Sequence, residues 1–210
     1  MALSTKIEGS AKVALALLAG AALATTLDQA VHTDEGVANW VSYFTNLSNL
    51  LGAATFLIGG LALLRGGRPV PDRLRGAATL YLVITGAVYW TLLADTIDAQ
   101  TIVWANDTVH GVMPVAVLAD WLLRPPAQPL RWSKGLPWLV FPLVYLAYSL
   151  IRGPYAHWYP YDFLDPRLPG GYQHVAVWSV IITVAFTAVM SLLILLGGVR
   201  SRQRAAAPVG

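Results

Sequence analysis

The fold class of this chain is decided by apolar stretches such as residues 174–196, HVAVWSVIITVAFTAVMSLLILL. At 1.5 Å per residue a helix of that length measures about 34 Å, enough to cross a hydrocarbon core about 30 Å thick. The stretch contains no Asp, Glu, Lys or Arg. It therefore predicts a helix that crosses a membrane.

Five further apolar runs precede this one, at approximately 11–27, 43–64, 76–94, 103–123 and 136–152. The 210 residues are 56% hydrophobic and 12% charged, and soluble domains carry about twice that share of charge. Little of the chain is left over for a soluble domain. We therefore predict an all-α, polytopic six-helix transmembrane bundle that forms a single integral membrane domain over residues 1–210.

The basic residues indicate how this bundle is oriented. Twelve of the fourteen lie before or at the start of the first run, or after the second, fourth and sixth: Lys6, Lys12, Arg65, Arg68, Arg73, Arg75, Arg124, Arg131, Lys134, Arg200, Arg202 and Arg204. The alternate loops hold only Arg152 and Arg167. This is the positive-inside pattern, and it predicts that both termini are cytoplasmic. The basic excess thus reports topology, and no nucleic-acid partner is expected.

Two features of composition bear on location and chemistry. Arginine outnumbers lysine eleven to three, which hints at a high-GC genome and a bacterial inner (plasma) membrane. The chain has no cysteine, which excludes disulfides, thiolate metal sites and cysteine nucleophiles. The first apolar run has an alternative interpretation as a signal peptide, because Lys6 and Lys12 precede it and Ala22-Leu23-Ala24 resembles a cleavage site.

The fourth run contains a histidine, in Trp104-Ala105-Asn106-Asp107-Thr108-Val109-His110-Gly111-Val112-Met113-Pro114. An ionisable group at membrane depth costs roughly 2.5–3.5 kcal/mol on insertion scales and usually faces a cavity. Asn106 and Asp107 precede His110 by four and three residues on the same helix face, so we expect Asp107 to orient the imidazole. Pro114 has no N–H for the carbonyl of His110, which predicts a bend. The alternative is a buried His–Asp pair whose role is only structural, to hold two helices together.

The second run opens with polar side chains on one helix face. Thr45, Ser48 and Asn49 share that face, and Asn46 adjoins them. Such residues commonly serve close helix packing with interhelical hydrogen bonds. Because Thr45 and His110 lie at similar depths, we also expect both to line one cavity that opens toward the outer leaflet.

Aromatic residues are candidates for the rest of that cavity. Tyr89 and Trp90 close the third run near its outer end, and the loop of residues 152–166 is rich in Trp and Tyr. The loop is either an interfacial aromatic belt or a lid in which Tyr159 or His157 gates lipid entry. No metal or other cofactor is expected, because the other histidines lie in or beside outer loops without ligand spacing.

Three motifs of the chain resemble those of a known group of membrane proteins: Tyr43-Phe44-Thr45-Asn46, Asn106 through His110, and Trp158-Tyr159-Pro160. In these motifs the chain resembles the androgen-induced and androgen-dependent TFPI-regulating membrane proteins, above all their bacterial relatives. The resemblance covers the whole chain in layout, on short motifs. The animal members hydrolyse fatty acid esters of hydroxy fatty acids with a threonine nucleophile and an intramembrane histidine. The resemblance implies Thr45 and His110 for these roles. It departs at Asp107, where the animal motif carries a second histidine.

The residues allow two hypotheses of function. In the first, the protein hydrolyses a membrane lipid or fatty acid ester. His110, the only histidine well inside a run, takes the proton of Thr45, and Asn46, Ser48 or Asn49 donates to the developing oxyanion. In the second, a non-enzymatic carrier, proton-coupled transporter or lipid-binding scaffold uses Asp107 and His110. We see no polar cluster on the inner halves of the runs and no internal repeat, which weighs against transport.

Overall fold

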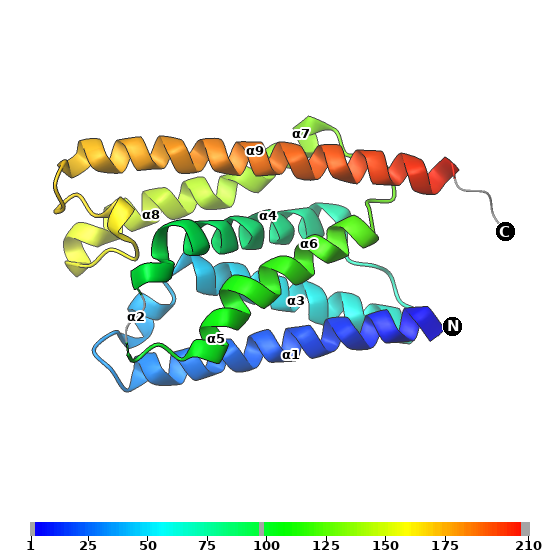
Figure 1. The fold of residues 1–210 in the computed structure, drawn as a ribbon, viewed down its shortest axis with the longest axis horizontal. Coiled ribbons are helices and arrows are strands. Elements are labelled where there is room, and N and C mark those ends of the chain that lie inside the picture. The colour runs from blue at the N-terminus through cyan, green and yellow to red at the C-terminus, as the bar shows by residue number, and fades with distance from the viewer. Residues whose placement is uncertain (1–2, 97–98, 207–210) are drawn as a thin grey trace.

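A computed structural model describes residues 3–96 and 99–206, and this part of the chain is helical with no β-strand. The long helices are α1 (Leu3–Val31), α3 (Phe44–Arg65), α4 (Asp72–Val88), α8 (Val140–Ala156) and α9 (Gly171–Ala206). They run along the longest axis of the molecule, and the start of α1 lies at the same end as the end of α9 (Figure 1). The all-α prediction is confirmed.

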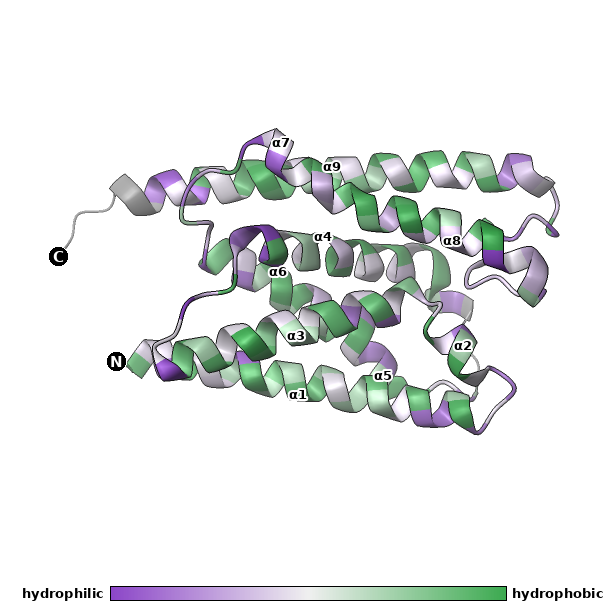
Figure 2. Cartoon of the chain, turned by 180° about the vertical axis from the view of Figure 1, so that it is seen from behind, coloured by the Kyte–Doolittle hydropathy of each residue, from purple (hydrophilic) through white to green (hydrophobic). Residues whose placement is uncertain are grey.

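Five helical stretches are long and apolar enough to cross a membrane: Leu3–Val31, Phe44–Arg65, Asp72–Leu93, Trp132–Ala156 and Gly171–Gln203. The third joins α4 to a π-helical turn, η1 (Tyr89–Leu93). The fourth joins α7 (Trp132–Gly135) and η4 (Leu136–Leu139) to α8. Hydrophobic residues fill the lengths of these helices, and many of the hydrophilic ones lie toward their ends (Figure 2). These are the helices of an integral membrane protein.

The run predicted at 103–123 is helical throughout but not uniform. It consists of α5 (Val103–Asp107), a π-helical turn η3 (Thr108–Val112) and α6 (Met113–Leu123). We expected a bend at Pro114, and the π turn ends two residues before that proline. The short elements α2 (Gly36–Trp40), η2 (Ala94–Thr96) and η5 (Asp162–Leu164) lie in the connections.

The π turn has a consequence for two neighbouring carbonyl groups. The N–H of Met113 donates to the carbonyl of Thr108, five residues back, so it does not bond the carbonyl of Val109. Pro114 has no N–H to offer the carbonyl of His110. Both carbonyls are therefore available to side chains of other helices.

Glycines bring α1 and α3 close together. A Cβ atom added to Gly60 would lie 2.7 Å from the carbonyl oxygen of Gly9. Helices in a membrane associate largely through such close packing, because lipid is as apolar as the side chains it would replace.

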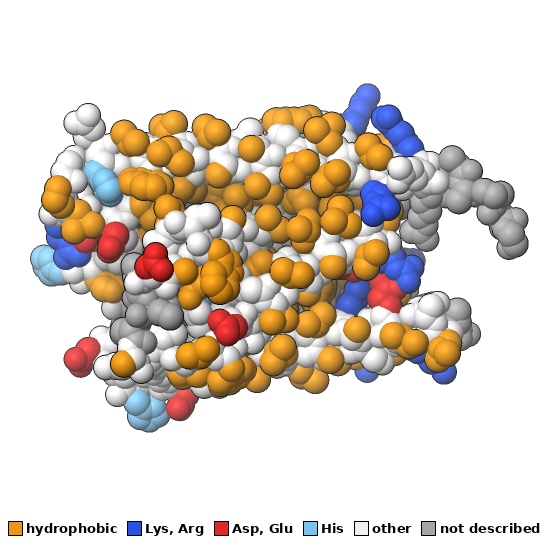
Figure 3. All heavy atoms as spheres, viewed as in Figure 1, with side chains coloured by type: hydrophobic (Ala, Val, Ile, Leu, Met, Phe, Trp, Pro, Cys, Tyr) orange, Lys and Arg blue, Asp and Glu red, His pale blue; other side chains and the backbone are white. Residues whose placement is uncertain are grey.

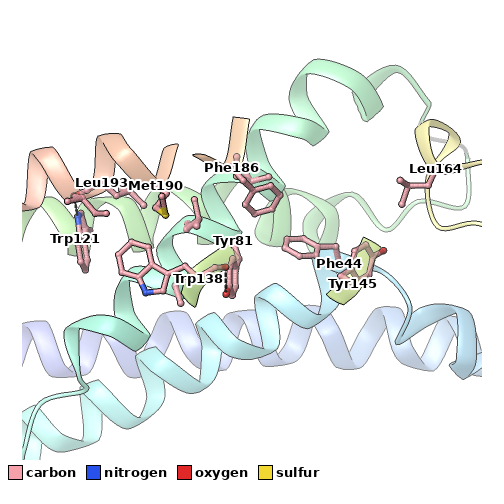
Figure 4. Close-up of a cluster of buried hydrophobic side chains, with 13 residues drawn as sticks. Phe44, Tyr81, Trp121, Trp138, Tyr145, Leu164, Phe186, Met190 and Leu193 are labelled. Carbon is pink, nitrogen blue, oxygen red and sulfur yellow. Dashed lines mark hydrogen bonds between the residues drawn. The ribbon is translucent and has the colours of Figure 1, made fainter. Parts of the chain in front are cut away.

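The start of α3 is anchored in an aromatic cluster (Figure 4). The ring centroid of Phe44 lies 5.1–6.0 Å from those of Tyr81, Phe141, Tyr145 and Phe186. These rings come from α4, α8 and α9. Since Phe44 is the first residue of α3, its burial also fixes the position of the residue that follows it, Thr45.

The outward face of the bundle is apolar. Val115, Ile151 and Val180 are each more than 60% exposed, and hydrophobic side chains cover much of the face seen in Figure 3. Exposed apolar surface on this scale marks an interaction site in a soluble protein. On helices that cross a membrane it is the surface that contacts lipid.

The end of the bundle that holds the start of α1 and the end of α9 (Figure 1), which the sequence predicts to be cytoplasmic, contains a charge network that the sequence analysis missed. Asp120 on α6 pairs with Lys12 of α1 at 2.7 Å and with Arg75 of α4 at 3.0 Å. Arg75 also pairs with Asp72 at 2.8 Å, and Glu8 pairs with Lys12 at 3.3 Å. The expectation of no polar cluster on the inner halves was wrong, because these residues lie within helices and face inward.

This network predicts a loss of stability on removal of its central carboxylate. The side chain of Asp120 is 12% exposed, and Asp120→Asn leaves Lys12 and Arg75 partly uncompensated. Breaking a buried ion pair by removing one partner costs about 3 kcal/mol. We expect a decrease of that size in the free energy of unfolding, measured in mixed detergent and SDS micelles. The control is Asp34→Asn, an exposed residue, which should change it by less than about 0.5 kcal/mol. Equal effects of the two substitutions would contradict the prediction.

Candidate active site

Thr45 and His110 meet in the structure. The hydroxyl oxygen of Thr45 lies 3.3 Å from Nε2 of His110. Thr45 is the second residue of α3 and is 8% exposed, and His110 is in the π turn η3. Two residues 65 positions apart in the chain, which the sequence analysis expected to line one cavity, thus share a hydrogen bond.

Two side chains hold this arrangement through the carbonyls that the π turn leaves unbonded. The amide nitrogen of Asn49 donates to the carbonyl of Thr45 at 2.9 Å and to that of Val109 at 3.1 Å. Nε1 of Trp90 donates to the carbonyl of His110 at 3.0 Å. Asn49 therefore ties the first turn of α3 to the residue before His110.

The remaining contacts of His110 fix its tautomer. Nδ1 lies 3.1 Å from the carbonyl oxygen of Asn106 and 3.0 Å from its side-chain oxygen. The side-chain amide is held in this orientation because its nitrogen donates to the hydroxyl of Tyr89 at 2.6 Å. Since both partners of Nδ1 are acceptors, Nδ1 carries the hydrogen and Nε2 presents a lone pair to Thr45. The ring of Tyr89 stacks on the imidazole at 3.9 Å.

Asn106, and not Asp107, therefore orients the imidazole. Asp107 is exposed, and within the described residues it forms no ion pair or hydrogen bond with His110. Asn106, four positions before His110, contacts the ring at Nδ1, while Asp107, three positions before it, is exposed. The sequence analysis chose Asp107 because it is charged, but the uncharged Asn106 is the residue that contacts Nδ1 of His110.

Tyr161 is a site residue that the sequence analysis did not name. Its hydroxyl lies 3.4 Å from both the backbone nitrogen and the hydroxyl of Thr45. Burial raises the pKa of Tyr161, so its hydroxyl keeps its proton at neutral pH. Tyr159, the expected gate, instead packs against Gly153, with the guanidinium of Arg167 5.2 Å from its ring centroid. The loop of residues 152–166 therefore contributes Tyr161 to the site, and not Tyr159.

Arg167 organises the loop that carries Tyr161. It donates to both carboxylate oxygens of Asp165, at 2.6–3.1 Å, and to the carbonyl of His157 at 2.7 Å. The hydrogen bonds from Arg167 hold the pKa of Asp165 below its usual range. His157 itself is exposed, has a φ of 49° and lines neither cavity beside Thr45, so the structure does not place it at the site.

Two cavities adjoin Thr45. A polar one of about 430 Å³ is lined by Thr45, His110 and Asn106 among others. An apolar one of about 110 Å³ lies among α4, α8 and α9 and is lined mainly by Leu, Ile, Val and aromatic side chains. Thr45 and Tyr161 line both cavities. The threonine therefore stands where a polar space and an apolar space meet.

The other expected cavity residues divide into two groups. Asn46 and Tyr89 line the polar cavity, and the amide of Asn46 also donates to the carbonyl of Trp40 at 2.8 Å. Ser48, Asn49 and Trp90 line neither of the two cavities. Ser48 is fully buried, and Asn49 uses its amide hydrogens on backbone carbonyls. Asn49 therefore has a structural role, because its amide hydrogens are used on backbone carbonyls and not on a ligand.

We also searched the described residues for a metal site. Within residues 3–96 and 99–206 there is no group of three or more His, Cys, Asp or Glu that could hold a metal ion. Comparison of the chain with protein-family models, curated proteins and solved structures finds no match.

The hydrogen-bond pattern predicts the tautomer of His110. In ¹⁵N NMR spectra of selectively labelled protein at neutral pH, we expect His110 to be neutral with its hydrogen on Nδ1. Asn106→Leu removes the side-chain acceptor and the bond to Tyr89, so it should shift the signals toward a tautomer mixture. Asp107→Asn should leave them unchanged, because Asp107 does not contact the ring. Hydrogen on Nε2 in the unsubstituted protein would contradict the assignment.

Proposed function

We propose that this protein is an intramembrane hydrolase of a lipid ester, with Thr45 as nucleophile and His110 as general base. The observation that carries the proposal is the 3.3 Å contact between the Thr45 hydroxyl and Nε2 of His110. A threonine hydroxyl is a weak nucleophile until an adjacent base takes its proton. The resemblance to the androgen-induced and androgen-dependent TFPI-regulating proteins supports the same two residues.

The proposed reaction proceeds by acyl transfer. The Thr45 oxygen attacks the ester carbonyl while Nε2 of His110 takes its proton, and the resulting tetrahedral species expels the alcohol, which receives that proton. Water then gives a proton to His110 and attacks the acyl-threonine. The Thr45 oxygen leaves with the proton from His110, and a carboxylic acid is released. Asn106 acts as a positioning residue that stabilises the imidazolium formed in both halves.

The start of α3 supplies donors for the oxyanion. In the first turn of a helix the N–H groups have no intrahelical partner, and the helix dipole favours negative charge there. The N–H of Thr45 has no partner within the helix and donates to the hydroxyl oxygen of Tyr161 at 3.4 Å. When an ester binds, this N–H and the protonated hydroxyl of Tyr161 both donate to its oxyanion instead. Preorganised donors of this kind are commonly the largest source of transition-state stabilisation. These groups replace Asn46, Ser48 and Asn49 as the proposed donors.

The proposal also includes the arrangement in the membrane. We propose six crossings, with α5, η3 and α6 together forming the fourth, and cytoplasmic termini. The basic residues near the start of α1 and the end of α9 support this orientation. The site then lies in the outer half of the bundle, and the apolar cavity beside Thr45 receives an acyl chain of the lipid.

The alternative, a carrier or scaffold built on Asp107 and His110, has less support. It requires the two side chains to act as a pair, and Asp107 points away from the imidazole. The polar cavity and the inner charge network are also separated by packed side chains. At Gly52, between the two, an added Cβ would contact Leu82 and approach Met113.

Alanine substitutions test the proposed roles. Thr45→Ala and His110→Ala should each lower kcat/KM by at least about 100-fold, measured with a panel of medium- and long-chain p-nitrophenyl esters and purified protein in detergent. Thr45→Ser should retain activity because it keeps the hydroxyl. Asp107→Asn is the matched control and should stay within about threefold of the unsubstituted protein.

Circular dichroism and thermal unfolding show whether each variant is folded. Full activity in the folded alanine variants would overturn the proposal, as would a complete lack of Thr45-dependent cleavage across the panel. pH-dependent flux in liposomes, with Thr45→Ala silent, would favour the carrier alternative.

A further inference from the structure

The polar cavity beside Thr45 has a distinctive charge, and this bears on which substrate the proposed hydrolase accepts. Two carboxylates, Glu35 and Asp162, line it. Among the described residues that line it there is no lysine or arginine. Of the described lining residues, His110 is the one whose side chain ordinarily titrates near neutral pH, and it is neutral when it acts as base. The lining therefore carries net negative charge.

The basic residues at this end of the bundle are engaged elsewhere. Arg152 donates to the side-chain oxygen of Asn39 at 2.7 Å and lies over the ring of Trp158. Arg167 is bound to Asp165 and to the carbonyl of His157. Neither arginine lines the cavity, so neither neutralises its carboxylates.

Aromatic rings accompany the two carboxylates. Trp40, Tyr43, Tyr89 and Tyr161 all line the same cavity. Glu35 lines the cavity together with these rings, and its negative charge adds to burial in raising the pKa of Tyr43 to about 12. Carboxylates together with tryptophan and tyrosine rings form the chemistry by which proteins bind ammonium and quaternary ammonium groups.

The position of Thr45 determines which part of an ester meets this cavity. The apolar cavity among α4, α8 and α9 suits an acyl chain, and it meets the polar cavity at Thr45 and Tyr161. An ester carbonyl at Thr45, with its acyl chain on the apolar side, directs its alcohol portion into the polar cavity. The charge of the alcohol portion is therefore what Glu35 and Asp162 select.

On the basis of the proposed function, we propose that the substrate is an acyl ester of a cationic alcohol, bound through an ammonium or quaternary ammonium group in the cavity of Glu35, Asp162 and the four rings. An alcohol that carries a carboxylate is disfavoured, because it would meet two like charges with no cation to pair with. This differs from what the family resemblance alone implies, since a hydroxy fatty acid carries a carboxylate.

Three esters with the same decanoyl chain test this inference. They are the choline ester, its uncharged isostere in which carbon replaces the ammonium nitrogen, and the anionic ester of glycolate. We expect kcat/KM to fall in that order at low salt, by about tenfold at each step. Added salt should narrow the differences, because it screens charges at a partly exposed site.

Charge-removing variants locate the selectivity. The double variant Glu35→Gln, Asp162→Asn should reduce the ratio of kcat/KM for the choline ester to that for its isostere to about threefold or less. Asp34→Asn, which removes an exposed carboxylate outside the cavity lining, is the matched control and should keep the full ratio.

The outcomes separate this inference from the proposed function. Thr45-dependent cleavage of all three esters at equal kcat/KM, or faster cleavage of the glycolate ester, would overturn the inference and leave the hydrolase intact. An unchanged ratio in the double variant would overturn it equally. Failure to cleave any of the three esters, when p-nitrophenyl esters are cleaved in a Thr45-dependent way, would also exclude a cationic-alcohol ester. Absence of all Thr45-dependent cleavage would remove the proposed function itself.

Discussion

The arrangement of the site depends on one side chain, Asn49, which bridges two helices. Its amide donates to the carbonyl of Thr45 on its own helix and to that of Val109 on the neighbouring one. The second bond exists only because the π turn leaves the carbonyl of Val109 without a helical partner. In an apolar environment an unbonded carbonyl costs several kcal/mol. The bridge satisfies that carbonyl, and in doing so sets the distance between Thr45 and His110.

Two π turns face each other at the site, one at Tyr89–Leu93 and one at Thr108–Val112. Such turns are uncommon and are found frequently at functional sites, because they release backbone groups and redirect side chains. Here Tyr89 and Trp90 come from the first turn and His110 from the second. Gly86 allows the two helices to approach, since a Cβ there would lie 3.0 Å from the carbonyl oxygen of His110. The helical scaffold is thus irregular where the proposed chemistry occurs.

Hydropathy and charge were sufficient to predict the fold class and the approximate helix positions, because both depend on the membrane and not on detailed contacts. Depth along the helices was also sufficient to pair Thr45 with His110. The partner of Nδ1 was predicted incorrectly, because Asn106 and Asp107 both suit the spacing and only the rotation of the helix separates them. Tyr161 was missed because it is placed by a loop with no periodicity. The charge network around Asp120 was missed because Lys12 and Arg75 look like flanking residues when helix boundaries are set too short.

The central claim is that His110 activates Thr45 as a nucleophile. A fluorophosphonate probe tests it most directly, because it phosphonylates an activated hydroxyl with loss of fluoride. Peptide mass spectrometry of the labelled protein should find the adduct on Thr45, and His110→Ala should abolish it while Asp107→Asn should not. An adduct on Ser48 or another hydroxyl, or Thr45 labelling that persists in folded His110→Ala protein, would contradict the account.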